Sequence, residues 1–128
     1  MKHLTWILTT ALTGVALATG CGSGGRADTS KLEQSFQSAG PAVRGEINQA
    51  VPAIRAGDYT KAMPVLQKVI KGGGLTDEQK EGISSAIVEM QMVVSQNPKK
   101  YSLETYHALS DLVTLLEGGQ PIPRTRSQ

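Results

Sequence analysis

The chain has 128 residues, a mass of 13.6 kDa and a formal net charge of +2 at pH 7. That length allows one small domain, and a charge so close to neutral argues against a dedicated nucleic-acid-binding protein. The single cysteine excludes an intramolecular disulfide and a zinc site built from cysteines.

The N-terminal segment, residues 1–20, has the layout of a secretory signal peptide. A basic start precedes an apolar run from Leu4 to Ala18. The run is about 15 residues long, whereas a membrane-spanning helix needs about 20. Three interpretations of this segment stay open: a signal peptide cleaved before Cys21, ordinary signal cleavage after Ala18, and an uncleaved anchor helix.

Cys21 follows the sequence LATG, and small residues before a cysteine at the end of such a run resemble the lipobox of bacterial lipoproteins. The resemblance implies that the Cys21 thiol receives a diacylglyceryl group, that cleavage occurs just before it, and that the new amino terminus is acylated too. The family prefers leucine where this chain has Ala18. Residues 16–18 also fit the small-x-small pattern of ordinary cleavage, which would give a soluble secreted protein.

Residues 21–29 are expected to form a flexible linker because they begin with the run Gly22–Gly25, which has little side chain to pack. More than one acyl chain on Cys21 would give stable membrane anchoring. By resemblance to enterobacterial lipoproteins, the absence of Asp at position 22 favours the outer over the inner membrane. The expected location is therefore the cell envelope: the periplasmic face of the outer membrane, or the cell surface, in a two-membrane host.

Residues 30–119 show helical periodicity throughout and no sustained apolar–polar alternation. A first short helix begins with a capping box formed by Ser30 at the N-cap and Glu33 at N3. It stops at Gly40. Its expected buried side chains are Leu32 and Phe36.

A second helix begins near Pro41, a favourable first-turn residue, and Asp58 caps a third, which the run Gly72–Gly74 ends. Pro52 and Pro64 fall inside these helices and are expected to kink or break them. The expected buried positions are Val43, Ile47, Ala50, Val51, Ile54, Tyr59, Ala62, Met63, Leu66, Val69 and Ile70.

Thr76 and Gln79 form a capping box at the start of a fourth helix, and Ser102 caps a fifth, with Tyr101 and Tyr106 as its hydrophobic staple. The expected buried positions are Ile83, Ala86, Ile87, Met90, Val94, Leu103, Tyr106, Leu109, Leu112, Val113 and Leu116. Short connections imply antiparallel neighbours. The predicted fold is therefore all-α, a small antiparallel helical-hairpin bundle over residues 30–119, and residues 120–128 are expected to be disordered.

The segment GDYTKA, residues 57–62, resembles the turn and second-helix start of a tetratricopeptide repeat. In that family the Gly makes the turn, the Asp caps, the Tyr packs back and the Ala permits close helix contact. The family's closing Pro is replaced by Gly72–Gly74, and no second copy at the roughly 34-residue period is visible in residues 75–119. The resemblance covers about one repeat, residues 41–74, and implies a tetratricopeptide-like hairpin.

Glu104, His107 and Asp111 share one helix face. Glu-x-x-His is half of a di-iron carboxylate site, which needs a second such motif and two more Glu residues. Because His107 is the only histidine beyond residue 20, we expect a solvated polar face. Ser84–Ser85 and Ser110 lack a neighbouring base and orienting group. The sequence therefore predicts no catalytic, cofactor-binding or metal-ligating residue and no enzyme activity.

The cluster Lys99-Lys100-Tyr101 is either a solvated loop or a contact with phosphate or lipid headgroups. Met90 is expected in the core, and Met92 is expected to be exposed. The glycine runs lack the Lys-Ser/Thr partner of a phosphate loop.

These features together predict a membrane-tethered bacterial lipoprotein with a small non-catalytic helical domain. We expect it to bind or scaffold other envelope proteins, since helical hairpins expose grooves for helices or extended peptides. The alternative is a soluble secreted or periplasmic helical protein that carries a ligand. That alternative predicts an unmodified Cys21 and a closed apolar cavity between the hairpins.

Overall fold

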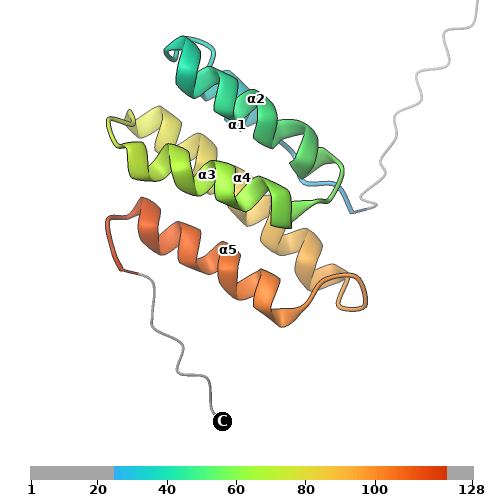
Figure 1. The fold of residues 1–128 in the computed structure, drawn as a ribbon. Coiled ribbons are helices and arrows are strands. Elements are labelled where there is room, and N and C mark those ends of the chain that lie inside the picture. The colour runs from blue at the N-terminus through green and yellow to red at the C-terminus, as the bar shows by residue number, and fades with distance from the viewer. Residues whose placement is uncertain (1–24, 121–128) are drawn as a thin grey trace, which may run out of the picture.

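Five α-helices make up the part of the chain that the computed structural model describes, residues 25–120 (Figure 1). Between Gly25 and Gln120 there is no β-strand, which confirms the predicted all-α helical-hairpin bundle. The expected signal peptide, Cys21 and the tail beyond Gln120 lie outside the described residues. The helices are α1 (Ser30–Ser35), α2 (Pro41–Arg55), α3 (Tyr59–Gly72), α4 (Asp77–Gln96) and α5 (Leu103–Leu116).

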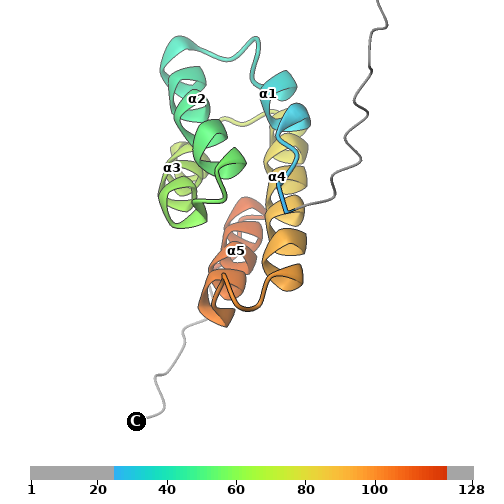
Figure 2. The ribbon, with the colours of Figure 1, turned by 90° about the vertical axis from the view of Figure 1, so that its right-hand side faces the viewer.

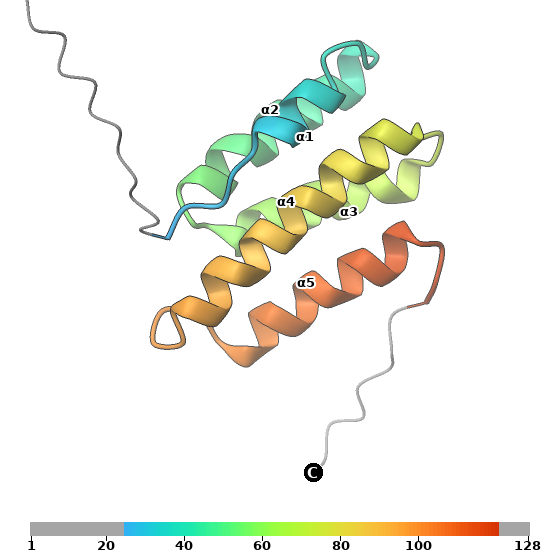
Figure 3. The same ribbon diagram turned by 180° about the vertical axis from the view of Figure 1, so that it is seen from behind.

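The helices contact one another in a closed ring. α2 and α3 form one antiparallel hairpin and α4 and α5 a second; α3 packs on α5, and α1 packs on α4 and more lightly on α2 (Figure 2). The two hairpins lie side by side in the same orientation, so α3 and α5 run parallel to each other (Figure 1). The α2–α3 and α4–α5 turns consequently lie at one end of the domain (Figure 3). Gly25 lies at this end too, because it is next to Asn97, which follows α4.

The core fills the inside of this ring, and most of the predicted buried positions are buried. Val43, Leu103 and Tyr106 are corrections, because they are 36%, 71% and 37% exposed. A helix turns by about 100° per residue, so Leu103 points roughly opposite to the buried Leu112 and cannot share its face. The least exposed large side chains are Leu32, Phe36, Ile47, Ile54, Tyr59, Leu66, Ile83, Ile87, Met90 and Leu109.

Three of the four predicted N-caps are confirmed. Asp58 accepts a hydrogen bond from the Lys61 backbone N–H at 3.2 Å, and Ser102 accepts one from Thr105 at 3.3 Å. At α4 both bonds of the capping box are present. Each cap satisfies an N–H group that the helix itself leaves without a partner.

The predicted capping box of α1 is wrong. Ser30 is the first helical residue, and its N–H donates to the Asp28 carboxylate at 2.8 Å. The Glu33 carboxylate accepts instead from the Thr29 hydroxyl at 3.1 Å and from the Arg55 guanidinium at 2.7 Å. The Thr29 hydroxyl and the Arg55 guanidinium from α2 therefore donate to Glu33 in place of the Ser30 N–H that the capping box predicts.

The folded region begins before residue 30. Ala27 and Thr29 are buried, and Arg55 Nε donates to the Thr29 hydroxyl at 3.1 Å. The expectation of a flexible linker over residues 21–29 is thus wrong for this stretch, because its side chains pack against α2 and the core. Residues 21–24 lie outside the described part.

α2 and α3 continue through Pro52 and Pro64, so the predicted helix breaks do not occur. Both prolines are exposed. A proline removes one backbone hydrogen bond, and on a solvent-facing side of a helix water can satisfy the carbonyl that loses its donor.

Candidate protein-binding groove

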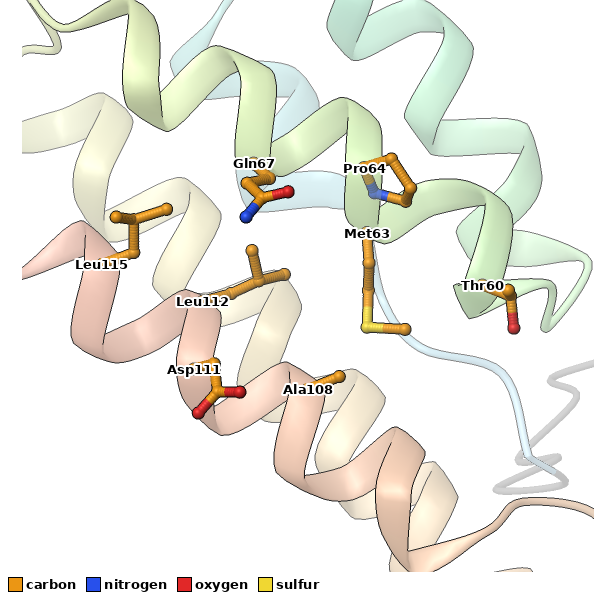
Figure 4. A pocket seen from close by; sticks show the side chains of 8 residues that line it. All are labelled: Thr60, Met63, Pro64, Gln67, Ala108, Asp111, Leu112 and Leu115. Carbon is orange, nitrogen blue, oxygen red and sulfur yellow. The ribbon is translucent and has the colours of Figure 1, made fainter. Parts of the chain in front are cut away.

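An open groove lies between α3 and α5 (Figure 4). It has a volume of about 300 Å³ and runs along the side of the domain, parallel to both helices. Four residues come from each helix, and we call this set the α3–α5 groove. Its lining residues are Thr60, Met63, Pro64, Gln67, Ala108, Asp111, Leu112 and Leu115.

The inner wall of the α3–α5 groove is apolar. The Met63 side chain reaches from α3 toward α5, beside Ala108 (Figure 4). Leu112 is only 5% exposed and forms the deep part, whereas Leu115 is half-buried. Because Ala108 has the smallest of these side chains, it leaves space that a larger residue would fill. The flexible thioether of Met63 suits a surface that adapts to a ligand.

The outer wall of the groove carries hydrogen-bonding groups. The Thr60 side chain lines the groove from α3. The Gln67 amide lies across from α5, and Asp111 lies on the α5 side (Figure 4). An apolar floor with a few polar groups at its margin is the usual chemistry of a ligand-binding groove.

A second hollow lies where α4 turns into α5, with a volume of about 460 Å³. Leu103, the first residue of α5, and Tyr106 are exposed beside it. Met92, three residues before Ser95 on α4, is also exposed, as predicted, and Met90 is buried. We call this hollow the α4–α5 turn surface; it is lined by Val94, Ser95, Pro98, Tyr101, Ser102, Leu103 and Tyr106.

Two tyrosines connect the α2–α3 turn to the α4–α5 turn. The rings of Tyr59 and Tyr101 are stacked with centroids 5.1 Å apart, and the Tyr101 hydroxyl donates to the Gly57 carbonyl at 3.0 Å. Lys100 Nζ lies 5.1 Å from the centroid of the Tyr101 ring, within the range of a cation–π contact. The predicted staple pairs Tyr101 with Tyr106; in the structure Tyr101 stacks on Tyr59, whereas Tyr106 is exposed.

Tyr59 is 1% exposed, and burial raises the pKa of its hydroxyl, with the neighbouring Tyr101 adding to the effect. Within residues 25–120 this hydroxyl has no hydrogen-bond partner. The side chain is therefore a neutral phenol at physiological pH. It acts as a large core residue, and its unpaired hydroxyl costs about 1–3 kcal/mol of stability.

Glu104, His107 and Asp111 lie on one face of the continuous helix α5, as their spacing predicts, and Glu104 is exposed. His107 is exposed, and its ring lies edge-on to the Tyr106 ring, with the two ring centroids 6.3 Å apart. Asp111 instead lines the α3–α5 groove. Among the described residues no three His, Cys, Asp or Glu side chains are grouped closely enough to hold a metal ion.

The serine hydroxyl on α5 has a structural role. Ser110 Oγ accepts from the Gln91 side chain at 3.1 Å and donates to the Tyr106 carbonyl at 3.2 Å. These bonds tie α5 to α4. Ser84 and Ser85 are half-buried on α4.

Cys21, the predicted lipidation site, lies outside the described residues, so its modification stays a prediction. Over residues 25–120, none of the helices has the length and apolar character required to span a bilayer.

No protein-family model matches the chain, and no similar curated protein or solved structure was found. The tetratricopeptide-like hairpin over residues 41–74 therefore stays a prediction. Sequence analysis did not identify Gln67, Pro64 or Ala108 as site residues. Their helical spacing places each on the flank of a predicted buried stripe, but only the packing of α3 against α5 brings the two flanks together.

Proposed function

We propose that this chain is a membrane-tethered bacterial lipoprotein whose small helical domain is non-catalytic and binds a segment of another envelope protein. The observation that best supports binding is the open, apolar α3–α5 groove. The lipobox resemblance at Cys21 supports the tether. The proposed location is the cell envelope, on the periplasmic face of an outer membrane or at the cell surface in a two-membrane host.

The shape of the groove favours a helix or an extended peptide as its occupant. Such a ligand would place apolar side chains against Met63 and Leu112, which are the deep apolar contacts. Its polar groups would meet the Thr60 hydroxyl and the Gln67 amide at the margin.

The soluble-carrier alternative predicts a closed cavity between the hairpins. Both the α3–α5 groove and the hollow at the α4–α5 turn open to solvent. An open groove of about 300 Å³ suits a macromolecular segment better than a small ligand that must be shielded from water.

Binding in the groove is tested with a photo-crosslinking residue at Gln67 of the full chain in its native host. We expect one envelope protein to be crosslinked from Gln67 and not from Gln49, an exposed position on α2. Ala108→Gln, which fills the groove, should reduce that crosslink about tenfold, as expected for the loss of one central contact. Ala42→Gln on the exposed face of α2 is the matched control. Equal yields from both variants would contradict the groove as the binding site.

The tether is tested by the mass of the N-terminal peptide of the protein purified from membranes. We expect a peptide that begins at Cys21 and carries the added mass of the acyl chains. Cys21→Ser should move the protein from the membrane to the soluble fraction. A chain that begins at Thr19 with an unmodified thiol would support the secreted alternative instead.

A further inference from the structure

We propose that the end of the domain bearing the α4–α5 turn docks onto the anionic surface of the bilayer that holds the lipid anchor. This inference rests on the proposed acylation of Cys21, and it assigns a function to exposed apolar and basic groups that the groove does not use. Three independent features of the described residues support it: the place where the chain enters the domain, the exposed apolar side chains there, and the local charge.

The chain enters the domain beside the C-terminal end of α4. A Cβ atom built on Gly25 would lie 3.7 Å from the Asn97 side chain, which directly follows α4. Only four residue steps separate Gly25 from Cys21, and such a segment spans at most about 14 Å. A lipidated Cys21 would therefore hold this end close to the headgroups, while the α1–α2 and α3–α4 loops lie at the opposite end (Figures 1 and 3).

The end that would face the bilayer carries exposed apolar groups. Leu103 is 71% exposed at the first position of α5, and Tyr106 one turn later is 37% exposed. Together with Pro98 they border the hollow of about 460 Å³. A leucine and an amphipathic tyrosine ring at the end of a domain suit the boundary between headgroups and acyl chains.

Cations lie next to these apolar groups. Arg26, Lys99 and Lys100 are exposed at this end, and Lys100 is held over the Tyr101 ring. The acids nearby are Asp28, Asp58, Glu89 and Glu104. The first two accept backbone N–H groups of their own segments.

The opposite end of the domain carries both signs of charge. Asp77 and Glu78 occupy the first turn of α4 there and Glu117 follows α5, while Lys71 lies in the last turn of α3 and Lys80 on α4. Cations beside exposed apolar side chains at the end next to the anchor suit an anionic surface, where each cation contributes favourably. In this orientation the α3–α5 groove lies on the side of the domain, where it stays open to a partner.

The test uses the full lipidated protein in vesicles of zwitterionic lipid with or without an anionic lipid. Leu103→Trp places a fluorophore on the α4–α5 turn surface, and Ser38→Trp, on the exposed α1–α2 loop, is the matched control. The unsubstituted protein gives the background. We expect lipids brominated on the acyl chains to quench Trp at position 103 and not at 38, and only when anionic lipid is present.

The charge contribution is measured with the same quenching signal. Arg26→Gln with Lys99→Gln should lower the ratio of docked to undocked protein about fivefold for each cation removed. The control pair, Lys71→Gln with Lys80→Gln, removes two cations from the opposite end and should leave the ratio unchanged. Added salt should weaken docking in the parent protein.

Several results would overturn docking while leaving the tether intact. If the protein floats with the vesicles but Trp at position 103 stays unquenched, the anchor holds and the docked orientation is wrong. If its emission changes with protein density on the vesicle rather than with anionic lipid, a second copy covers the surface. If the protein does not float at all, the proposed tether is wrong, and docking is overturned with it.

Discussion

We call the contact between two neighbouring helices of the ring a seam. Two seams each contain a small residue, but the space beside that residue is filled in one and open in the other. At the α1–α4 seam, a Cβ atom on Gly82 would lie 2.0 Å from Ser35 Oγ and 3.1 Å from the Lys31 carbonyl oxygen, so the α1 backbone already occupies the space. At the α3–α5 seam, the space beside Ala108 is open (Figure 4). A small side chain thus permits either close packing or a groove, and the element opposite decides which one forms.

The largest difference between the seams should appear when one leucine in each is truncated. Leu32, on α1, is 0% exposed, whereas Leu115, on α5, is half-buried at the groove. Leu32→Ala should lower the free energy of unfolding by about 2–5 kcal/mol, because it leaves a cavity in packed surroundings. Leu115→Ala should cost less than about 1.5 kcal/mol, because solvent already reaches the site. Urea denaturation of the full chain measures both, and equal losses would contradict the contrast between a closed and an open seam.

Replacing a glycine by alanine should lower the free energy of unfolding at the closed seam and raise it on an open helix surface. Gly82→Ala gains about 1 kcal/mol in helix propensity but overpacks α1 by about 1–3 kcal/mol. Because the Lys31 carbonyl is backbone and cannot rotate away, we expect net destabilisation. Gly45→Ala in α2 is the control, since nothing lies within 4 Å of its Cβ position; it should stabilise by about 0.5–1 kcal/mol.

A second substitution shows whether contact with α1 causes the destabilisation by Gly82→Ala. Ser35→Gly removes the nearest side-chain atoms, and combining it with Gly82→Ala should recover part of the loss measured by urea denaturation. If Gly82→Ala instead stabilises the protein as much as Gly45→Ala does, the close approach of α1 to α4 is wrong.

The elements that sequence analysis predicted well are those fixed by local chemistry. Asp58, Thr76 and Ser102 cap helices because their oxygens reach an N–H group within three residues. The buried stripes of α2, α3 and α4 follow from helical periodicity alone. All-α architecture and the short connections between helices are consequences of the same local patterns.

The incorrect predictions concern residues whose partners are distant in sequence. Glu33 binds Arg55 from α2, which displaced the expected capping box at Ser30. The error at Leu103 is local instead: its apolar side chain predicts burial, but its angular position on α5 is opposite to that of Leu112. The groove itself depends on how α3 meets α5, and the spacing along one helix carries no information about that pairing.

The smallest expected effect is a pH-dependent one at the rim of the closed seam. Lys31 Nζ lies 2.9 Å from Glu81 Oε1, with the two side chains 63% and 69% exposed. Hydrogen bonding and charge from Lys31 lower the pKa of Glu81 below its usual 4.5. A carboxylate with a depressed pKa in the folded state stabilises the fold at neutral pH, and this contribution disappears as the pH falls below 4.5 and through the lowered pKa.

Glu81→Gln should therefore shift the urea midpoint slightly at about pH 7 and not at a pH below the lowered pKa of Glu81, where the wild-type carboxyl is also uncharged. Because both groups are exposed, the shift at neutral pH should be smaller than that of either packing variant and should diminish in high salt. Glu117→Gln, at the exposed C-terminal end of α5, is the control for losing a surface carboxylate. A shift that is the same at both pH values would mean that Glu81 stabilises the α1–α4 seam through the packing of its side chain rather than through its charge.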